Sequence, residues 1–386
     1  MKKDRVRMRS LFAVAAAVMA SLLVAPASSQ SFVDQHGALR IQGNKVMDSH
    51  DKPITLRGMA LYWSQWKPLF YNAQCVKWLR DDWKCNVVRA SIAVGYGGYL
   101  ENADKEMAKL RTVVRAAIDL GIYVIIDFHE TDNGNDHLSQ AKKFFDDVSK
   151  EFGSSPNVIY ETWNEPLGSH AWASVIKPYH EAIIPVIRAN DPDNIILCGT
   201  KTWSQDVDEA SKNPITLSKN IAYTLHFYAS THKESLRAKA KTALANGIAL
   251  MVTEGGVSEA SGKGAIDTVE ARRWCEFMDE NGILWTNWSV ADLSESSAAL
   301  KLGASVNGGW NESNLNPSGI WVRNRLRSMA ATVSLARPRT YGAAMSLNAP
   351  VSGTLVAMRD AKGRLFLEAR KDASRTGLPV FIPPDR

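Results

Sequence analysis

Short apolar runs alternate with amphipathic stretches along most of the chain. The runs are rich in β-branched and aromatic residues and end on polar or turn-forming residues, which is typical of buried parallel strands. The stretches between them carry apolar positions at helical spacing. The predicted strands cover residues 54–60, 86–92, 122–128, 158–163, 194–199, 221–227, 248–253 and 283–288. The clearest predicted helices cover residues 70–83, 103–120, 138–152, 171–189, 234–245 and 267–281.

This alternation predicts an α/β fold. Eight strands with helices between them, in one run of about 300 residues, favour a (β/α)8 TIM barrel over a doubly wound sheet. Residues 33–53 precede the first strand as short polar and apolar pieces broken by Gly37 and Gly43, and they predict a hairpin-like lead-in. The alternation stops after about Met329.

The last residues, 332–386, differ in composition from the rest. They hold five prolines, and nine Lys and Arg against four Asp and Glu. Residues 353–358 and 364–369 flank Asp360-Ala361-Lys362-Gly363, which predicts a β-hairpin. The segment is therefore interpreted as a C-terminal extension of uncertain structure, either loosely packed or a small structured appendage.

The first residues, 1–27, have the pattern of a secretory signal peptide. A basic beginning precedes an apolar stretch from Leu11 to Val24 and the small-residue sequence Ala25-Pro26-Ala27. A retained membrane anchor is disfavoured because a span needs about 20 apolar residues, and no later segment has them. Cleavage is expected between Ala27 and Gln30, which predicts a secreted or periplasmic protein without a membrane span.

Removal of this segment also changes the charge. It holds five Lys and Arg against one Asp, so the formal net charge falls from +6 to +2. A nucleic-acid partner, suggested by the high isoelectric point of the full chain, is therefore not expected. Four cysteines allow three pairings, but Cys198 lies in an apolar run and Cys275 on a predicted helix, so buried free thiols are expected over disulfides, also for Cys75 and Cys85.

Polar and aromatic side chains follow the predicted strands. In residues 158–166, VIYETWNEP, Pro166 cannot continue a ladder and leaves Glu165 at the strand end. Residues 248–254 likewise end on Glu254, before two glycines. Because the C-terminal ends of barrel strands share one rim, such residues converge. The predicted rim residues are Trp66, Arg89, His129, Asn164, Glu165, His226, Tyr228, Glu254 and Trp288. This set is typical of a sugar-cleaving site.

Eight stretches carry a family resemblance. They are LRGMALYWSQW (56–66), WLRDDWKCNVVRAS (78–91), YVIIDFH (123–129), VIYETWNEP (158–166), GTKTWSQDV (199–207), YTLHFYASTH (223–232), MVTEGG (251–256) and NWSVADLSESSAALKLGA (287–304). In these the chain resembles glycoside hydrolase family 5, the cellulase family, and is most similar to the bacterial endo-β-1,4-glucanases of its second subfamily. The resemblance covers residues 33–331, which are expected to form the catalytic domain, and does not extend to the tail.

The resemblance implies a retaining hydrolysis of internal β-1,4-glucosidic bonds. Glu254 corresponds to the nucleophile and Glu165 to the acid/base, with carboxyl groups roughly 5 to 5.5 Å apart. The pKa of Glu165 is expected to be raised by its neighbours, including Glu254, while Arg89 would keep Glu254 ionised. The remaining implied roles are a bond from Asn164 to the sugar 2-hydroxyl, one from Tyr228 to the nucleophile, and orientation of the acid/base and sugar by His226 and His129.

Aromatic residues are expected to bind the substrate. Trp66, Trp203 and Trp288 match family positions that stack on sugar rings, Glu295 matches a polar contact, and the Trp288-Ser289 peptide matches a non-proline cis bond. Departures from the family pattern occur at Tyr62, Ala93 and Leu293, where relatives carry a histidine, a tyrosine and a lysine. Trp63 and Tyr96 are candidate substitute surfaces, so Tyr62, Trp63 and Tyr96 join the substrate-binding candidates.

Several alternatives stay open at this point. The enzyme alternatives are a β-mannanase, xylanase or xyloglucanase of the same family, and the alternative of another class is a catalytically silent glucan-binding protein. A metal cluster of His129, Asp132, Asp136 and His137 fits no metal-ligand spacing, so no metal or other cofactor is expected. Glu161 is expected in a polar layer inside the barrel and Asp127 in a structural ion pair. A monomer acting on a β-1,4-glucan is the expected assembly.

Overall fold

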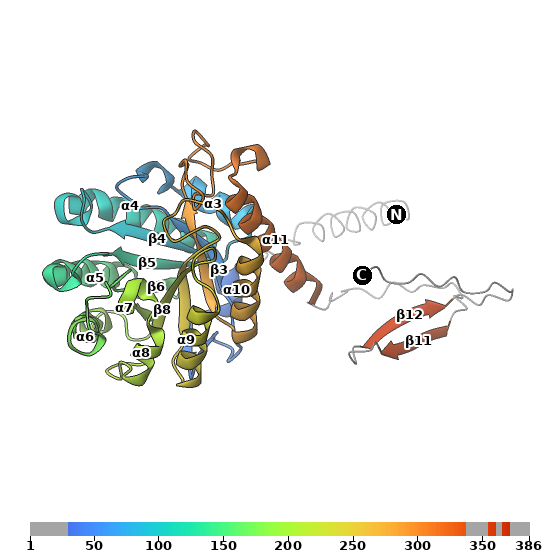
Figure 1. The fold of residues 1–386 in the computed structure, drawn as a ribbon, viewed down its shortest axis with the longest axis horizontal. Helices are drawn as coiled ribbons and strands as arrows, with labels where there is room; N and C mark the ends of the chain where they lie inside the picture. Colours follow the sequence, from blue (N-terminus) through green and yellow to red (C-terminus); the bar gives the residue numbers. More distant parts are fainter. Residues whose placement is uncertain (1–29, 337–353, 360–364, 371–386) are drawn as a thin grey trace, which may run out of the picture. The chain divides into compact units, whose positions relative to one another are not determined.

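The computed structural model describes residues 30–336, 354–359 and 365–370 (Figure 1). The predicted signal peptide, residues 1–27, lies outside this part of the chain. None of the helices in the described residues is both long enough and apolar enough to span a membrane. The chain divides into two units between Ser334 and Leu335, and each is considered by itself.

The first unit is a closed barrel of eight parallel strands, as the alternation of apolar runs predicted. The strands follow one another around the barrel in the order β10-β3-β4-β5-β6-β7-β8-β9. They are β3 (Arg57–Leu61), β4 (Val87–Ala93), β5 (Tyr123–His129), β6 (Val158–Glu161), β7 (Ile196–Cys198), β8 (Ile221–Tyr228), β9 (Leu250–Gly256) and β10 (Leu284–Val290). The prediction of a (β/α)8 barrel is confirmed.

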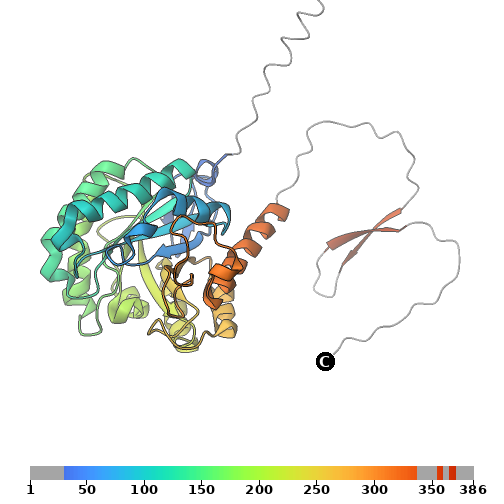
Figure 2. The same ribbon diagram turned by 90° about the horizontal axis from the view of Figure 1, so that it is seen from above.

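Helices surround this barrel (Figures 1 and 2). The main ones are α3 (Ala73–Asp81), α4 (Tyr99–Leu120), α5 (Leu138–Phe152), α6 (Lys177–Arg188), α8 (Val207–Lys212), α9 (Glu234–Ala245), α10 (Thr268–Asn281) and α11 (Pro317–Ala336). The predicted helix at 171–189 begins as a π-helical turn, Trp172–Ile176, before α6. Two short helices between β7 and β8, α7 (Lys201–Ser204) and α8, were not among the clearest predicted ones.

The interior of the barrel changes from apolar to polar along each strand. At the N-terminal ends the inward residues form one apolar cluster, which includes Leu56, Val87, Tyr123, Ile125, Ile159, Leu197, Ala222, Met251 and Leu284. Side chains alternate between the two faces of a strand, so the next inward positions follow at steps of two. On β5 these are Asp127 and His129, and on β4 they are Arg89 and Ser91. The polar positions therefore gather at the C-terminal ends, where barrel enzymes hold their active sites.

The lead-in closes the opposite end of the barrel. Its hairpin pairs β1 (Arg40–Gln42) with β2 (Lys45–Met47), as predicted, and Val33, Leu39 and Val46 join the inner apolar cluster. The prediction missed a helix before the hairpin, α2 (Phe32–His36). That helix is five residues long and therefore too short to show a helical period; its start is set by a capping box between Ser31 and Asp34.

The predicted C-terminal hairpin is also present. β11 (Thr354–Arg359) pairs antiparallel with β12 (Leu365–Arg370). Helix α11 runs past residue 331, where the sequence placed the end of the barrel region. The four cysteines are buried free thiols, as predicted. Burial raises the pKa of Cys75 to about 12, so this thiol is unreactive at neutral pH.

Candidate active site

A bulge in β9 brings two consecutive side chains into the barrel. Met251 pairs with Thr224 of the neighbouring strand β8, and Glu254 pairs with His226. Between these two pairs the chain advances by three residues in β9 but by only two in β8. The other neighbour, β10, shows the same shift. In a regular strand Thr253 and Glu254 would point to opposite faces, but the extra residue lets both reach interior partners. Thr253 contacts Glu161, and Glu254 contacts Arg89.

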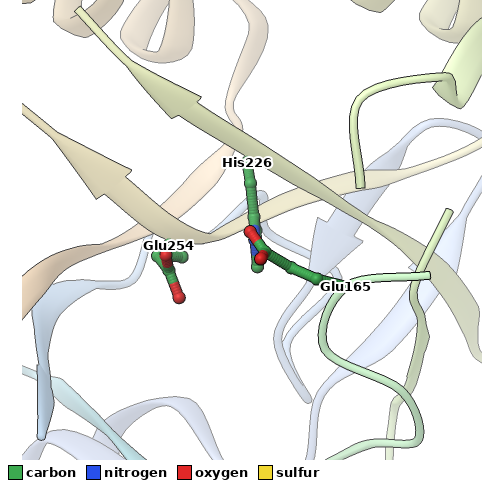
Figure 3. Close-up of side chains that lie close together, drawn as sticks. All are labelled: Glu165, His226 and Glu254. Carbon is green, nitrogen blue, oxygen red and sulfur yellow. The ribbon is translucent and has the colours of Figure 1, made fainter. Parts of the chain in front are cut away.

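Glu165 and Glu254 face one another across the mouth of the barrel (Figure 3). Glu165 follows β6 and Glu254 lies on β9. One carboxylate oxygen from each, together with a ring nitrogen of His226, lie within 4.8 Å of one another. Side-chain exposure is 19% for Glu165 and 7% for Glu254, so a ligand can reach both while little water surrounds them. The structure therefore brings together the two carboxylates that the sequence placed at the shared rim of the barrel.

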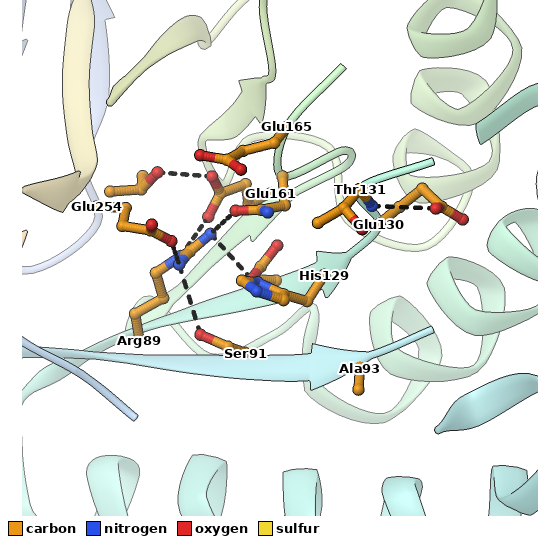
Figure 4. A network of polar contacts seen from close by, with 12 residues as sticks. Arg89, Ser91, Ala93, His129, Glu130, Thr131, Glu161, Glu165 and Glu254 are labelled. Carbon is orange, nitrogen blue, oxygen red and sulfur yellow. Dashed lines mark hydrogen bonds and ion pairs between the residues drawn. The ribbon is translucent and has the colours of Figure 1, made fainter. Parts of the chain in front are cut away.

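Arg89 is the single cation at the centre of a buried polar network (Figure 4). Its guanidinium pairs with Glu161 at 2.8 Å, Asp127 at 2.9 Å and Glu254 at 3.3 Å. It also donates to the Asn164 side-chain oxygen at 2.7 Å. Because that oxygen is occupied, the Asn164 amide group is left to donate elsewhere. Arg89 therefore positions the candidate nucleophile and the neighbouring amide together, and the contacts expected of Asp127 and Glu161 are present.

Tyr228 holds Glu254 from the other side. Its hydroxyl donates to Oε1 of Glu254. The ring lies so close to Gly256 that an added Cβ would sit 2.4 Å from it. A side chain at position 256 would displace the tyrosine, so the glycine after the strand is required for the contact with Glu254.

The carboxyl groups have altered proton affinities. The pKa of Glu165 is raised to about 8, and burial is the largest cause. The charge of Arg89 lowers this pKa, whereas the charges of Asp127 and Glu161 raise it further. The sequence predicted a contribution from Glu254, whereas the largest cause is burial. The pKa of Glu254 is also raised, first by burial and then by Glu165, against the attraction of His226 and Arg89. Since Glu254 touches the permanent charge of Arg89, a single proton shared by the pair resides on Glu165.

Two histidines flank the carboxylates. His226 Nδ1 lies 2.9 Å from Oε1 of Glu165. His129 Nδ1 lies 2.6 Å from Asp127, and its ring is stacked on Trp288 and met edge-on by Trp63. Burial lowers the pKa of His129 to about 3, so the ring is neutral. Asp127 also pairs with Arg89, which favours its carboxylate form, and a carboxylate can only accept, so Nδ1 is assigned as the donor to Asp127. The free lone pair on Nε2 can then accept a hydrogen bond from a ligand hydroxyl.

These side chains line a cavity of about 170 Å³ at the C-terminal end of the barrel. Its lining residues are Tyr62, Trp63, His129, Asn164, Glu165, Tyr228, Glu254, Ala260, Ser261, Gly262, Trp288, Glu295 and Ser297. Residues 260–262 and Ser297 were not predicted, because they lie in loops after β9 and β10 and carry no strand-end signal. A larger hollow of about 690 Å³ lies between α10 and α11, away from the strand ends.

The predicted aromatic residues fall into two groups. The ring centroids of Tyr62 and Trp288 lie 5.3 Å apart in the cavity wall. Trp66 extends this aromatic surface, because its ring centroid lies 6.4 Å from that of Tyr62 and 6.4 Å from that of Tyr96. The indole of Trp66 is 51% exposed and the Tyr96 ring 62% exposed, so both present open faces beyond the cavity. The Trp288-Ser289 peptide is cis, as the resemblance implied.

Trp203 is the second group and lies apart from this aromatic surface. It occupies a left-handed turn in which Thr202, Trp203 and Ser204 all have positive φ. The turn is tied to the end of β6, because Trp203 N–H donates to Pro166 and Ser204 Oγ donates to the Asn164 carbonyl. Three such residues in sequence are strained unless neighbouring contacts hold them. The turn lies beside the loop that carries Glu165, and Trp203 within it is 48% exposed.

Metal-ligand residue types meet only partly as the sequence suggested. His129 pairs with Asp127, whereas His137 pairs with Glu130, so the four residues considered as a metal cluster contact separate partners. Among the described residues, Glu165, His226 and Glu254 are close enough to hold an ion. Both ring nitrogens of His226 already have partners, Glu165 and Thr253. The trio is therefore better explained as a proton-handling site than as a set of metal ligands.

Comparisons with known proteins agree with this geometry. Residues 47–294 match the model of the family described as Cellulase (glycosyl hydrolase family 5). An endoglucanase of Clostridium saccharobutylicum is 47% identical over 304 residues, which are 78% of this chain and 68% of that protein. A solved structure from Cytophaga hutchinsonii has a TM-score of 0.78 and 47% identity, covering 80% of this chain and all of that one. A variant of the catalytic domain of Thermobifida fusca endoglucanase Cel5A, in complex with cellotetraose, has a TM-score of 0.74 and 33% identity over 77% of this chain and 99% of that one.

Proposed function

The chain belongs to glycosyl hydrolase family 5, the cellulase family, and on that premise we propose that it is a retaining endo-β-1,4-glucanase. The observation that carries the proposal is the separation of the two carboxylates. Oxygens of Glu165 and Glu254 approach within 4.8 Å. Retaining glycosidases hold their carboxyl groups about 5 to 5.5 Å apart, whereas inverting enzymes leave roughly 6.5 to 9.5 Å for a water molecule.

The first half of the proposed reaction uses the two carboxyl groups in opposite protonation states. Glu254 is held ionised by Arg89 and oriented by Tyr228, and it attacks the anomeric carbon. Glu165 gives its proton to the departing glycosidic oxygen. The leaving chain departs as an alcohol, and the sugar is held as an ester on Glu254.

In the second half, the roles reverse. The Glu165 carboxylate removes a proton from water, which attacks the anomeric carbon and releases Glu254. Asn164 is placed to donate to a sugar hydroxyl next to the reacting carbon, because its oxygen is bound by Arg89. His129 also lines the cavity and offers a neutral Nε2 acceptor. Both contacts would orient the sugar ring for attack.

The test is hydrolysis of carboxymethylcellulose, with mannan, xylan and xyloglucan in parallel. We expect a rapid fall in viscosity with little reducing sugar released, because an endo-acting enzyme cuts within chains. Cleavage of mannan, xylan or xyloglucan in place of glucan would leave the carboxylate roles and replace the substrate. A folded protein that binds glucan and releases no sugar from any polymer would support the silent binding scaffold instead.

The pH profile of kcat/KM is expected to be bell-shaped with a high alkaline limb. The acid/base must be protonated, so activity falls as pH rises through the pKa of Glu165, about 8. The nucleophile must be ionised, so activity also falls as pH drops through the raised pKa of Glu254, above the roughly 4.3 of an ordinary glutamate. An alkaline limb near pH 5 would contradict the role of Glu165.

Trp66→Ala is expected to raise KM roughly fivefold to tenfold for cellopentaose and to leave cellotriose nearly unaffected. The exposed indole lies beyond the cavity that holds the carboxylates, so only a longer chain reaches it. Loss of about 50 Å² of apolar contact corresponds to ~1 kcal/mol. Leu69→Ala is the matched control, because this side chain is 69% exposed and stands three residues further along the chain. Equal effects of Trp66→Ala on both substrates would place the indole outside the glucan site.

We also propose the remaining organisation of the chain. Residues 1–27 would direct export, which gives a secreted or periplasmic enzyme, and residues 33–331 would form the catalytic domain. Residues 332–386 would form a separate extension that includes the hairpin β11–β12. A monomer binding a β-1,4-glucan is sufficient for this function, because both carboxylates come from one chain.

A further inference from the structure

We propose that Thr253 and Glu161 are positioning residues that fix the tautomer of His226 and thereby keep the reactive proton on Glu165, at its Oε1 atom. This inference rests on the proposed role of Glu165 as acid/base. The observations behind it are four hydrogen bonds that connect Arg89 to Glu165 through the barrel interior. Each donor along this chain can be assigned from the number of protons that its atoms carry.

The chain starts at a carboxylate that can only accept. Glu161 Oε2 receives a hydrogen bond from Arg89 Nε at 2.8 Å, and neither side chain is exposed. Burial raises the pKa of Glu161, and the contact with Arg89 opposes this. Because a permanent cation donates to one of its oxygens, the geometry favours the carboxylate form of Glu161. Its other oxygen, Oε1, lies 2.6 Å from Thr253 Oγ1. A hydroxyl has one proton, and Thr253 therefore gives it to Glu161.

The direction of the next hydrogen bond follows from that assignment. His226 Nε2 lies 2.8 Å from the same Thr253 oxygen. Since that oxygen has no proton left to give, it accepts, and Nε2 must carry the hydrogen. Burial lowers the pKa of His226 to about 4, so the imidazole is neutral and has one N–H only. Nδ1 therefore presents a lone pair.

The lone pair of Nδ1 points at the acid/base. Oε1 of Glu165 lies 2.9 Å from Nδ1, which is a hydrogen-bond distance. Because Nδ1 carries no proton, the proton of this hydrogen bond must come from Glu165. The carboxylic acid form is therefore stabilised by a hydrogen bond, and the carboxylate form would face a lone pair. After Glu165 protonates the leaving oxygen, this repulsion favours its recovery of a proton from the attacking water. This series of hydrogen bonds thus sets the protonation state of Glu165 before each half of the proposed reaction, and the proton gives up its hydrogen bond to Nδ1 when it passes to the glycosidic oxygen.

Other charges around Glu165 do not change this direction. The groups that face Glu165 and His226 are Arg89 on β4, Asp127 and His129 on β5, Glu161 on β6, Tyr228 on β8 and Glu254 on β9. Among them only Arg89 favours the carboxylate form of Glu165, whereas Asp127 and Glu161 oppose it. None of them donates a hydrogen bond to Nε2 or Nδ1 of His226 in competition with Thr253 and Glu165.

The neighbouring threonine supplies a matched control. Thr224 Oγ1 donates to the same Oε1 atom of Glu161, at 3.2 Å, and is equally buried. In the described part of the chain the ring nitrogens of His226 bond to Glu165 and Thr253, and not to Thr224. Thr253→Val removes the acceptor for Nε2–H, so His226 can change to the Nδ1–H form and donate to a Glu165 carboxylate. Thr224→Val removes a bond to Glu161 alone. Thr253→Ser keeps the hydroxyl of this series of hydrogen bonds.

The experiment compares pH profiles of these three variants with the unchanged enzyme. A hydrogen bond to the charged form of an acid is worth enough to lower its pKa by about one unit. Thr253→Val is therefore expected to move the alkaline limb of kcat/KM down by about one pH unit, while Thr224→Val and Thr253→Ser leave it in place. A limb that stays fixed in a folded Thr253→Val protein, or moves equally in Thr224→Val, would overturn the proposal.

A second readout does not depend on activity. The ring nitrogens of the eight histidines can be labelled with ¹⁵N, and the His226 signals assigned by their loss in His226→Asn. The unchanged protein is expected to show a protonated Nε2 and an unprotonated Nδ1 at neutral pH. A protonated Nδ1 would contradict the proposed tautomer of His226, whichever polymer the enzyme cleaves. The expected tautomer in a protein that releases no sugar would instead remove the proposed function and leave the hydrogen-bond assignment standing.

Discussion

Replacing Glu254 with glutamine is expected to lower kcat on carboxymethylcellulose by at least about 10⁴-fold, because the residue that forms the covalent intermediate has no substitute nearby. The amide is nearly the same size, so Arg89 and Tyr228 can stay in place, but it cannot attack the anomeric carbon. Substrate affinity should change little, since Glu254 contributes to bond making and not to the aromatic surface. The measurement is viscosity loss and reducing-sugar release at saturating substrate.

Two controls separate loss of the nucleophile from loss of the fold. Glu234→Gln removes a carboxylate of the same kind on α9, where the side chain is 65% exposed, and should leave activity unchanged. Glu254→Ala opens space for azide, which should attack an aryl cellobioside from the side that Glu254 occupied. The product would be an α-glycosyl azide, with the aryl alcohol as the other product. Formation of the β-azide would assign attack to the opposite face and contradict the role of Glu254.

The fold could be predicted because its signals are local. Each strand from β3 to β10 is a short apolar run, and inward residues alternate with outward ones until the polar end is reached. The sequence also located Glu165, which follows β6 and directly precedes Pro166. It also located Arg89 and His226, because both stand at polar positions in otherwise apolar strands.

The rest of the site depends on contacts between distant segments. The bulge in β9 is not visible in MVTEGG, where simple alternation turns Thr253 away from Glu254, so the role inferred for Thr253 could not be derived from the sequence. The left-handed turn at Trp203 depends on hydrogen bonds to the end of β6, some 37 to 40 residues away in the chain. The dominant cause of the raised pKa of Glu165 is burial, which only the closed barrel reveals.

Removing the acid/base is expected to have an effect that depends on the leaving group. Glu165→Ala should lower the hydrolysis of carboxymethylcellulose by about 10³-fold, within the range that general acid catalysis contributes. With a dinitrophenyl cellobioside, whose leaving group needs no proton, the first step should proceed at nearly its normal rate. The glycosyl-enzyme on Glu254 should then accumulate, because no base activates the water. A burst of dinitrophenol equal to the enzyme concentration is the measurement.

Azide distinguishes Glu165 from Glu254 through the stereochemistry of the product. In Glu165→Ala, azide needs no general base and should attack the glycosyl-enzyme from the face where the leaving group departed, which gives a β-glycosyl azide and restores turnover. The corresponding change at Glu254 gives the α-product, so each variant is the control for the other. The alkaline limb of the pH profile should also disappear for the dinitrophenyl substrate, since the group that titrates with a pKa of about 8 is gone. An unchanged limb would assign that titration to another group and separate the raised pKa of Glu165 from catalysis.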